Sequence, residues 1–212
     1  VPTTEGKKVP IELSLAIHSD AGYSTDSSVI GSLSICTTNF NDGKLNSGIS
    51  RIASRDFATA LLVGINRDIK EKYKSWICRE IYDRNYSETR SPEMPSAILE
   101  TMSHQNFNDM IYGQDPNFRF TLARSIYKTI LKYISAQHGC KYIVQPLAPT
   151  NFSVEHINGN EIKLSWSEAV DSLEPTSHPT SYKIYTSTET GDFDNGHNVK
   201  KTSYIMDIDP DK

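Results

Sequence analysis

Apolar and small residues alternate over residues 13–17, and the pattern stops abruptly at the polar residues 18–20. Apolar or small side chains on both sides of a run are typical of a strand buried on both faces. Residues 97–99 form a second apolar run, which is too short for a helix and is also predicted to be a buried strand. Residues 29–38 alternate well enough to predict a third strand between them.

Two longer segments have helical periodicity. In residues 51–73 an apolar side chain recurs every four residues, which predicts an amphipathic helix of about six turns. Its charged residues, Arg51 and Asp68 among them, are expected on the solvent-facing side. A second helix is predicted to begin at Asp115 as N-cap with Pro116 at the first helical position, and to end near Gly139.

Beyond residue 147 the hydrophobic period changes from near four to two. Short alternating runs separated by turn residues predict a small β-sandwich, with Trp166 and Tyr182 in its core. Two prolines within residues 145–149 mark a linker. The sequence therefore predicts an α/β domain over residues 1–144 and a β-sandwich over residues 150–212. Only about four or five strands fit into it, so we expect a partial sandwich with exposed strand edges.

Composition excludes several classes of protein. The net charge is −4, and residues 147–212 hold 5 Lys and Arg against 11 Asp and Glu, leaving 17 against 15 elsewhere. Neither part has the basic stripe that nucleic-acid binding requires. No apolar run approaches the roughly 18 residues of a membrane span. Cys36, Cys78 and Cys140 are widely spaced and odd in number, so all three are expected to be buried free thiols.

Candidate chemistry lies where the predicted buried strands end. Open α/β sheets bind ligands at the carboxyl ends of their strands. His18 follows the first run and Glu100 directly follows the run at residues 97–99. A carboxylate in such a place is costly unless it is paired or lies in a solvated cleft. We therefore expect His18 and Glu100 to meet at one rim of a shared sheet and to form the functional site.

These segments resemble the zinc-dependent N-acetylmuramoyl-L-alanine amidases. Residues 14–21 (SLAIHSDA) are similar to the family's SIHANA-like segment, which supplies a zinc histidine. Residues 98–106 (ILETMSHQN) are similar to its VLVETGFLSN-like segment, which supplies the catalytic glutamate. Residues 99–110 and 116–120 look most like the amidase-type domain of bacterial proteins labelled xanthan lyase. Those proteins commonly continue into a fibronectin type III module, which residues 147–212 resemble.

The resemblance implies an open, mostly parallel sheet with flanking helices, incomplete at its N-terminal side, followed by a partial fibronectin type III-like sandwich. It implies that zinc is bound by His18 and that Glu100 is the catalytic base. The family's other two zinc ligands, a histidine and a glutamate, are expected upstream of residue 1. The implied substrate is the lactyl–L-alanine amide of peptidoglycan, and the implied location is secreted, periplasmic or associated with the cell envelope.

Three further residues are candidates for the cleft. Asp20 is a candidate for orienting the His18 imidazole, although a role in the loop turn is the simpler interpretation. Arg90 is a candidate for binding a substrate carboxylate, with a surface salt bridge as the alternative. His104 lies in the loop after Glu100 and is expected either to line the cleft or to lie on the surface.

Two other classes of function stay open. One is a carbohydrate-active enzyme of the xanthan lyase type, for which Tyr82, Tyr86 and Arg90 are the nearest candidates. The other is a non-catalytic envelope or glycan-binding protein, in which the sandwich is a spacer. The sequence upstream of residue 1 would discriminate between them, because an additional histidine and glutamate there would favour the enzyme.

Overall fold

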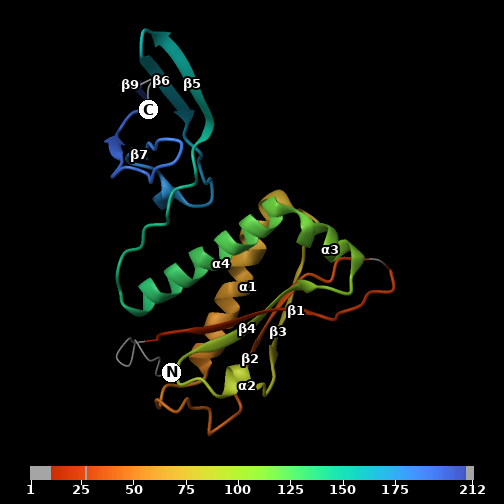
Figure 1. Cartoon of the computed structure of the whole chain (residues 1–212). Coiled ribbons are helices and arrows are strands. Elements are labelled where there is room, and N and C mark those ends of the chain that lie inside the picture. The colour runs from red at the N-terminus through yellow and green to blue at the C-terminus, as the bar shows by residue number, and fades with distance from the viewer. Residues whose placement is uncertain (1–10, 27, 209–212) are drawn as a thin grey trace. The chain divides into compact units, whose positions relative to one another are not determined.

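The structure is a computed structural model that describes residues 11–26 and 28–208 (Figure 1). The chain divides into two compact units, Val1–Lys141 and Tyr142–Lys212. The first unit is an α/β structure and the second is built of β-strands. Each unit is described by itself.

In its described residues, the first unit contains one four-stranded sheet. Its strands are β1 (Ser14–Asp20), β2 (Ser32–Cys36), β3 (Cys78–Asp83) and β4 (Ser96–Ser103), in the order β1-β4-β2-β3. The β1/β4 and β2/β3 pairings are parallel, and the central β2/β4 pairing is antiparallel. The predicted α/β class with a mostly parallel sheet is confirmed.

Two predicted details of these strands are wrong. β1 is not buried on both faces, because it is the edge strand of the sheet and Ile17 is 60% exposed. Glu100 does not follow the second strand, because β4 continues to Ser103 and Glu100 lies within it. The pairing with β1 carries the strand past the end of its apolar run, since backbone hydrogen bonds between strands do not depend on side-chain polarity.

The helices of the first unit are α1 (Ile52–Lys72), α2 (Ser87–Arg90), α3 (Phe107–Gln114) and α4 (Pro116–Gln137). Figure 1 shows α1 beside α4, and α1 packs against both α4 and the sheet. The two long helices confirm the predicted periodic segments. None of the helices in the described residues is long and apolar enough to cross a bilayer.

α1 and α4 pack closely against each other, and the main core includes residues of both helices. A Cβ atom at Gly64 would lie 2.2 Å from Oγ1 of Thr129, so a larger residue there would push the helices apart. The α4 N-terminus is capped as predicted, because a carboxylate oxygen of Asp115 accepts a hydrogen bond from the Asn117 backbone N–H at 2.8 Å. The largest core side chains around this contact are fully buried: Phe57, Leu61, Ile65, Ile69, Trp76, Leu99 and Phe118.

Arg51 is buried, which contradicts its predicted place on the solvent face of α1. Its Nε donates to the carbonyl oxygens of Phe40 and Lys44, both at 3.0 Å. Nη1 donates to the Thr89 carbonyl at 3.2 Å and Nη2 to the Arg90 carbonyl at 2.8 Å. Burial lowers the pKa of this guanidinium. Arg51 therefore joins the loop before α1 to α2, a role that helical periodicity does not reveal.

Asp68 is also buried, again contrary to the prediction. Its carboxylate lies 2.9 Å from Nζ of Lys128 on α4, and the two side chains are each 4% exposed. The neighbouring Arg67 pairs with the same carboxylate at 2.8 Å. Burial opposes ionisation of Asp68, but the hydrogen bonds from Arg67 and Lys128 outweigh it and lower the pKa. This buried ion pair therefore joins α1 to α4.

The cysteines are free thiols, as predicted. Cys36 is buried and Cys78 is half-buried, and burial raises the pKa of each thiol to about 11. Cys140 is exposed, so the expectation that all three are buried is wrong for this residue. It lies just after the C-terminal end of α4, where the chain leaves the first unit.

Up to residue 208, the second unit contains five strands. β5 (Thr150–Asn158), β6 (Glu161–Ser167) and β9 (Ser203–Asp207) form an antiparallel sheet in the order β5-β6-β9. β7 (Tyr182–Ile184) and β8 (His197–Val199) form a separate antiparallel pair. A single 3-10 turn, Pro175–Ser177, lies between β6 and β7. The Trp166 and Tyr182 rings pack edge to face with their centroids 5.2 Å apart, joining the two β layers.

Replacement of Arg51 by lysine tests its role in the fold. Lysine cannot reach the carbonyl groups on both sides of the guanidinium, and each buried polar group left unpaired costs about 1–3 kcal/mol. We expect Arg51→Lys to lower the free energy of unfolding by about 3 kcal/mol, measured by guanidinium unfolding followed by helical circular dichroism. The control is Arg55→Lys, at an exposed position in the first turn of α1. Equal losses in both variants would contradict the assignment.

The Asp68–Lys128 pair predicts a pH-dependent loss of stability. Removing one partner of a buried pair costs about 3–5 kcal/mol, so we expect Asp68→Asn to destabilise the first unit by that amount near neutral pH. Because the folded pKa of Asp68 is below its ordinary value of 3.8, its stabilisation is present above that value and is lost as the pH falls further. The difference from wild type should therefore shrink in acid, whereas Glu71→Gln, at an exposed site of α1, should show no effect at either pH.

Candidate functional site

The register of β1 and β4 brings His18 and Glu100 together. The two strands are parallel, and the Cα atoms of His18 and Glu100 are direct partners. Partner residues on neighbouring strands point to the same face of a sheet. Nδ1 of His18 accordingly lies 3.9 Å from Oε1 of Glu100. The structure thus places these two side chains next to each other on a shared sheet, as expected.

Glu100 is held in an environment that favours its protonated form. Its side chain is only 13% exposed, and Oε2 is buried without a hydrogen-bond partner in the described residues. Burial is the largest cause of a raised pKa, to which Asp20 and Glu88 add. His18 and Arg79 act in the opposite direction and do not cancel the effect. A carboxyl group of this kind is suited to accepting a proton and returning it.

Glu88 is a site residue that the sequence did not indicate. Its Oε1 lies 2.8 Å from Nε2 of His18, and both side chains are partly exposed. This hydrogen bond holds the Nε2 edge of the imidazole, and the Nδ1 edge faces Glu100. Glu88 lies on the short helix α2, within a polar segment that has no hydrophobic period or motif to single it out.

Asp20 does not contact the His18 imidazole. One carboxylate oxygen pairs with Nη2 of Arg79 on β3 at 2.7 Å, and the other accepts the Gly22 backbone N–H at 2.8 Å. Asp20 thus stabilises the turn after β1, and its ion pair holds the Arg79 guanidinium of β3 near the site. Its influence on Glu100 is electrostatic, since it contributes to the raised pKa of that carboxyl group.

His104 and Arg90 lie in different surroundings. Nδ1 of His104 is 3.1 Å from both the hydroxyl and the carbonyl oxygen of Ser19, next to His18 in the chain. His104 is therefore beside the end of β1, one residue away from the site. The Arg90 guanidinium donates to Oδ1 of Asn85 at 3.0 Å and lies over the Phe40 ring.

The end of β4 is fixed by Asp109, a second residue that the sequence did not indicate. Its buried carboxylate accepts the backbone N–H groups of Ile30 at 2.8 Å, Gly31 at 3.0 Å and Ser103 at 2.8 Å. Gly31 has φ of 72°, and a Cβ there would lie 2.1 Å from the Ile77 carbonyl oxygen. Asp109 thus joins α3 to the start of β2 and the end of β4, three residues beyond Glu100.

The described residues do not fit a complete zinc site. No group of three or more His, Cys, Asp or Glu side chains in this part of the chain is arranged to hold a metal ion. A catalytic zinc takes three protein ligands and one open position. His18 is the imidazole that faces Glu100, and its Nε2 is engaged by Glu88.

No protein-family model and no curated protein sequence matches the chain. Several solved N-acetylmuramoyl-L-alanine amidase structures are similar to it. CwlD from Clostridioides difficile, solved in complex with the GerS lipoprotein, is 17% identical with a TM-score of 0.48, covering 61% of this chain and 57% of that chain. AmiC2 of Nostoc punctiforme is 18% identical with a TM-score of 0.45, covering 58% of each chain. The CwlV catalytic domain from Bacillus (Paenibacillus) polymyxa is 19% identical with a TM-score of 0.46, covering 58% of each. The chain thus spans less than two thirds of their length.

The raised pKa of Glu100 predicts how stability responds to pH. The native state binds a proton more tightly than the unfolded chain, so stability falls as the pH rises above the ordinary value of 4.5 toward the raised one. Glutamine is neutral throughout and lacks this fall. We expect Glu100→Gln to gain stability relative to wild type between about pH 4 and pH 7, measured by thermal unfolding.

The matched control is Glu80→Gln, at an exposed position of β3. In this variant the change in stability between about pH 4 and pH 7 should equal that of wild type. A Glu100→Gln variant that follows the wild-type pH dependence would show that the carboxyl group titrates normally in the folded protein.

Proposed function

We propose that this chain is part of a cell-wall amide hydrolase of the N-acetylmuramoyl-L-alanine amidase type. The proposed substrate is the amide that joins the lactyl group of N-acetylmuramic acid to L-alanine in peptidoglycan. The observation that supports the proposal is the in-register pairing of β1 and β4, which sets the His18 imidazole 3.9 Å from a buried Glu100 with a raised pKa. These are also the two residues on which the sequence resemblance depends.

In the proposed reaction Glu100 moves the proton. Its carboxylate takes a proton from the water whose oxygen attacks the amide carbonyl carbon. The carbon–nitrogen bond then breaks, and the same proton passes from Glu100 to the leaving amine. The raised pKa makes the Glu100 carboxylate a stronger base for the first transfer. Glu88 fixes the His18 ring through Nε2, so that the Nδ1 edge stays directed at Glu100.

We propose zinc as the metal of the intact site, with His18 as the ligand that this chain contributes. Because residues 11–26 and 28–208 do not themselves supply three ligands, the remaining ones would come from outside them. Zinc would supply Lewis-acid activation of the carbonyl and of water. His18 would have to exchange its hydrogen bond with Glu88 for the metal if Nε2 is the ligating nitrogen.

We further propose that the protein acts outside the cytoplasm, in the cell envelope, where peptidoglycan is found. The second unit is proposed to be fibronectin type III-like and to act as a spacer or docking module. What supports this is its antiparallel strand pattern together with the Trp166–Tyr182 packing between its two β layers.

One observation favours a second candidate, a non-catalytic envelope protein that binds glycan. The 2.8 Å contact between Glu88 and His18 occupies Nε2, as in a site that has exchanged metal binding for an internal hydrogen bond. Such a protein would bind peptidoglycan without cleaving it.

Amide release from purified peptidoglycan by the full-length protein tests the proposal. We expect Glu100→Gln to reduce release by about 10²- to 10⁴-fold, the usual contribution of a general acid–base residue. Its zinc content should equal that of wild type, because Glu100 is proposed to move protons and not to bind metal. Glu80→Gln, exposed on β3, should keep wild-type activity.

Equal activity of Glu100→Gln and wild type would remove Glu100 as the base. Binding to insoluble peptidoglycan without any amide release by the wild-type protein would favour the non-catalytic candidate. Loss of zinc in Glu100→Gln would instead assign this carboxylate to the metal.

A further inference from the structure

Arg79 on β3 lies on the same face of the first unit's sheet as Glu100. Cys78 and Leu99, which precede these two residues in their strands, both pack in the core that the helices cover. Successive side chains of a strand point to opposite faces, so Arg79 and Glu100 point away from that core. One face of the sheet therefore carries a guanidinium as well as the His18–Glu100 pair.

The Arg79 side chain reaches across the sheet and is held at two points. Its Nη2 lies 2.7 Å from Oδ2 of Asp20, at the end of β1, and donates to the Gly31 carbonyl oxygen, just before β2, at 3.0 Å. β1 and β2 flank β4 on its two sides. The guanidinium is therefore held across β4, the strand that carries Glu100.

Both anchors lie close to the level of Glu100 along the sheet. The Cα partners of Glu100 are His18, two residues before Asp20, and Leu33, two residues after Gly31. At about 3.3 Å per residue, each anchor is displaced by roughly 7 Å along its strand, in the same direction. The charge of Arg79 also acts on the Glu100 carboxyl group. This spacing suits an amide group that lies between the cation and the carboxyl group.

The guanidinium is fixed in place but still has donors to offer. Both of its contacts use Nη2, and the described residues accept no hydrogen bond from Nη1. A guanidinium presents five N–H donors in one plane, so Asp20 and Gly31 hold the group without engaging all of them. The Arg79 side chain is 21% exposed. A donor that is oriented before the substrate arrives needs little reorganisation during the reaction.

The surrounding charges favour a neutral carbonyl oxygen as the partner of Arg79. In the described residues, the charged groups that act on Glu100 include the carboxylates of Asp20 and Glu88. A carboxylate of the substrate would be repelled by these groups. An amide carbonyl has no net charge when it binds, and its oxygen becomes negative only as water attacks the carbon.

We propose that Arg79 is a catalytic residue that donates a hydrogen bond to the carbonyl oxygen of the scissile amide. As the water oxygen bonds to the carbonyl carbon, Glu100 takes the water proton and the C=O electron pair moves to the carbonyl oxygen, where the guanidinium stabilises it. The pair then re-forms the C=O bond while the C–N bond breaks, and the leaving nitrogen takes the proton from Glu100. This inference rests on the proposed hydrolase function and adds a residue to it.

The alternative is a purely structural role, in which the Asp20–Arg79 ion pair only joins the end of β1 to β3. Loss of either partner breaks that pair, so Arg79→Ala and Asp20→Asn should then have equal effects. A catalytic Arg79 predicts instead that Arg79→Ala lowers activity at least about tenfold more than Asp20→Asn, because only the first variant removes the donor.

Steady-state amide release from a soluble N-acetylmuramoyl-L-alanine peptide by the full-length protein tests the inference. We expect Arg79→Ala to lower kcat by about 10²- to 10³-fold, the usual effect of removing one donor to a developing oxyanion. KM should change by less than about twofold, because the interaction strengthens in the transition state. Arg79→Lys keeps a cation beside Asp20 and should still lower kcat, since an ammonium group lacks the planar fork.

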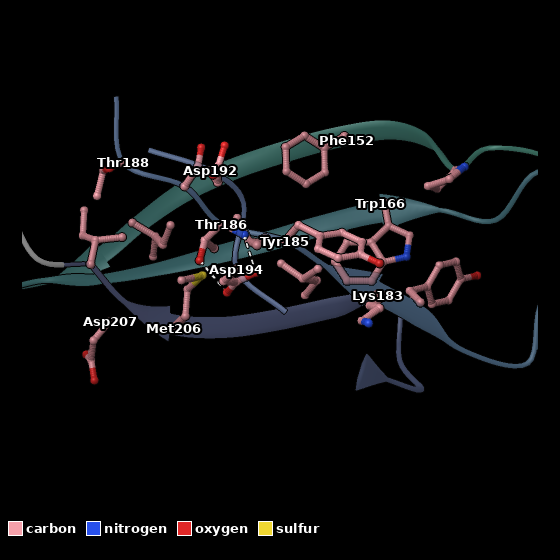
Figure 2. Close-up of a pocket in the computed structure, with 17 residues that line it drawn as sticks. Phe152, Trp166, Lys183, Tyr185, Thr186, Thr188, Asp192, Asp194, Met206 and Asp207 are labelled. Carbon is pink, nitrogen blue, oxygen red and sulfur yellow. Dashed lines mark hydrogen bonds between the residues drawn. The ribbon is translucent and has the colours of Figure 1, made fainter. Parts of the chain in front are cut away.

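Chemical rescue separates a missing donor from a disturbed fold. Guanidinium chloride at a concentration that does not unfold the protein should raise kcat of Arg79→Ala at least about tenfold, and sodium chloride at the same concentration should not. Two controls remove other cations and should keep the wild-type kcat. They are Arg84→Ala, exposed directly after β3, and Lys183→Ala, in the groove of the second unit (Figure 2).

Three results would overturn the inference and leave the hydrolase proposal standing, because the wild-type protein releases the amide in each. One is equal loss in Arg79→Ala and Asp20→Asn without rescue by guanidinium. Another is unchanged kcat in Arg79→Ala, or in Arg79→Lys if the alanine variant does not fold. The third is a raised KM with unchanged kcat, which would make Arg79 a ground-state binding residue. A wild-type protein that releases no amide would overturn both proposals.

Discussion

The first unit depends on the parallel pairing of an edge strand with a central one. β4 lies between β1 and β2, so its position is fixed on both sides, whereas β1 is held by β4 alone. A shift of β1 by one residue would turn His18 to the opposite face and separate it from Glu100. The site therefore exists only in this register. Ser14, at the start of β1, is held by a backbone hydrogen bond to the Pro95 carbonyl, and the Cα pairing runs without irregularity from there to His18.

Buried polar groups hold the elements around this sheet. Asp109 fixes the end of β4 against the start of β2, and Arg51 fixes α2 against the loop that precedes α1. Through α2, Arg51 also determines where Glu88 lies, and Glu88 in turn orients the His18 ring. The geometry of the site thus depends on hydrogen bonds to backbone groups that lie far from it in sequence, which is how a rigid scaffold supports a precise site.

The two units differ in how completely their apolar surface is covered. In the first, two long helices cover one face of the sheet, and the largest apolar side chains are fully buried. In the second, Trp166 and Leu164 are buried while Phe152 and Val154 on the neighbouring strand remain exposed. Burial of apolar surface contributes about 25 cal/mol per Å², so the described strands of the second unit realise less of this stabilisation than the first unit does.

The sequence by itself determined the two long helices, the Asp115 cap, the change of period near residue 147 and the two residues at the centre of the site. Those features follow from local periodicity and from single polar residues beside apolar runs. Both signals involve only residues that are close together in the chain. Tertiary structure decided that Arg51 and Asp68 are buried, that β1 is an edge strand, and that Glu88 and Asp109 take part in the site or support it. Charged residues are placed by distant partners, such as Glu88, which lies 70 positions from His18, and no pattern along the chain specifies a partner at that distance.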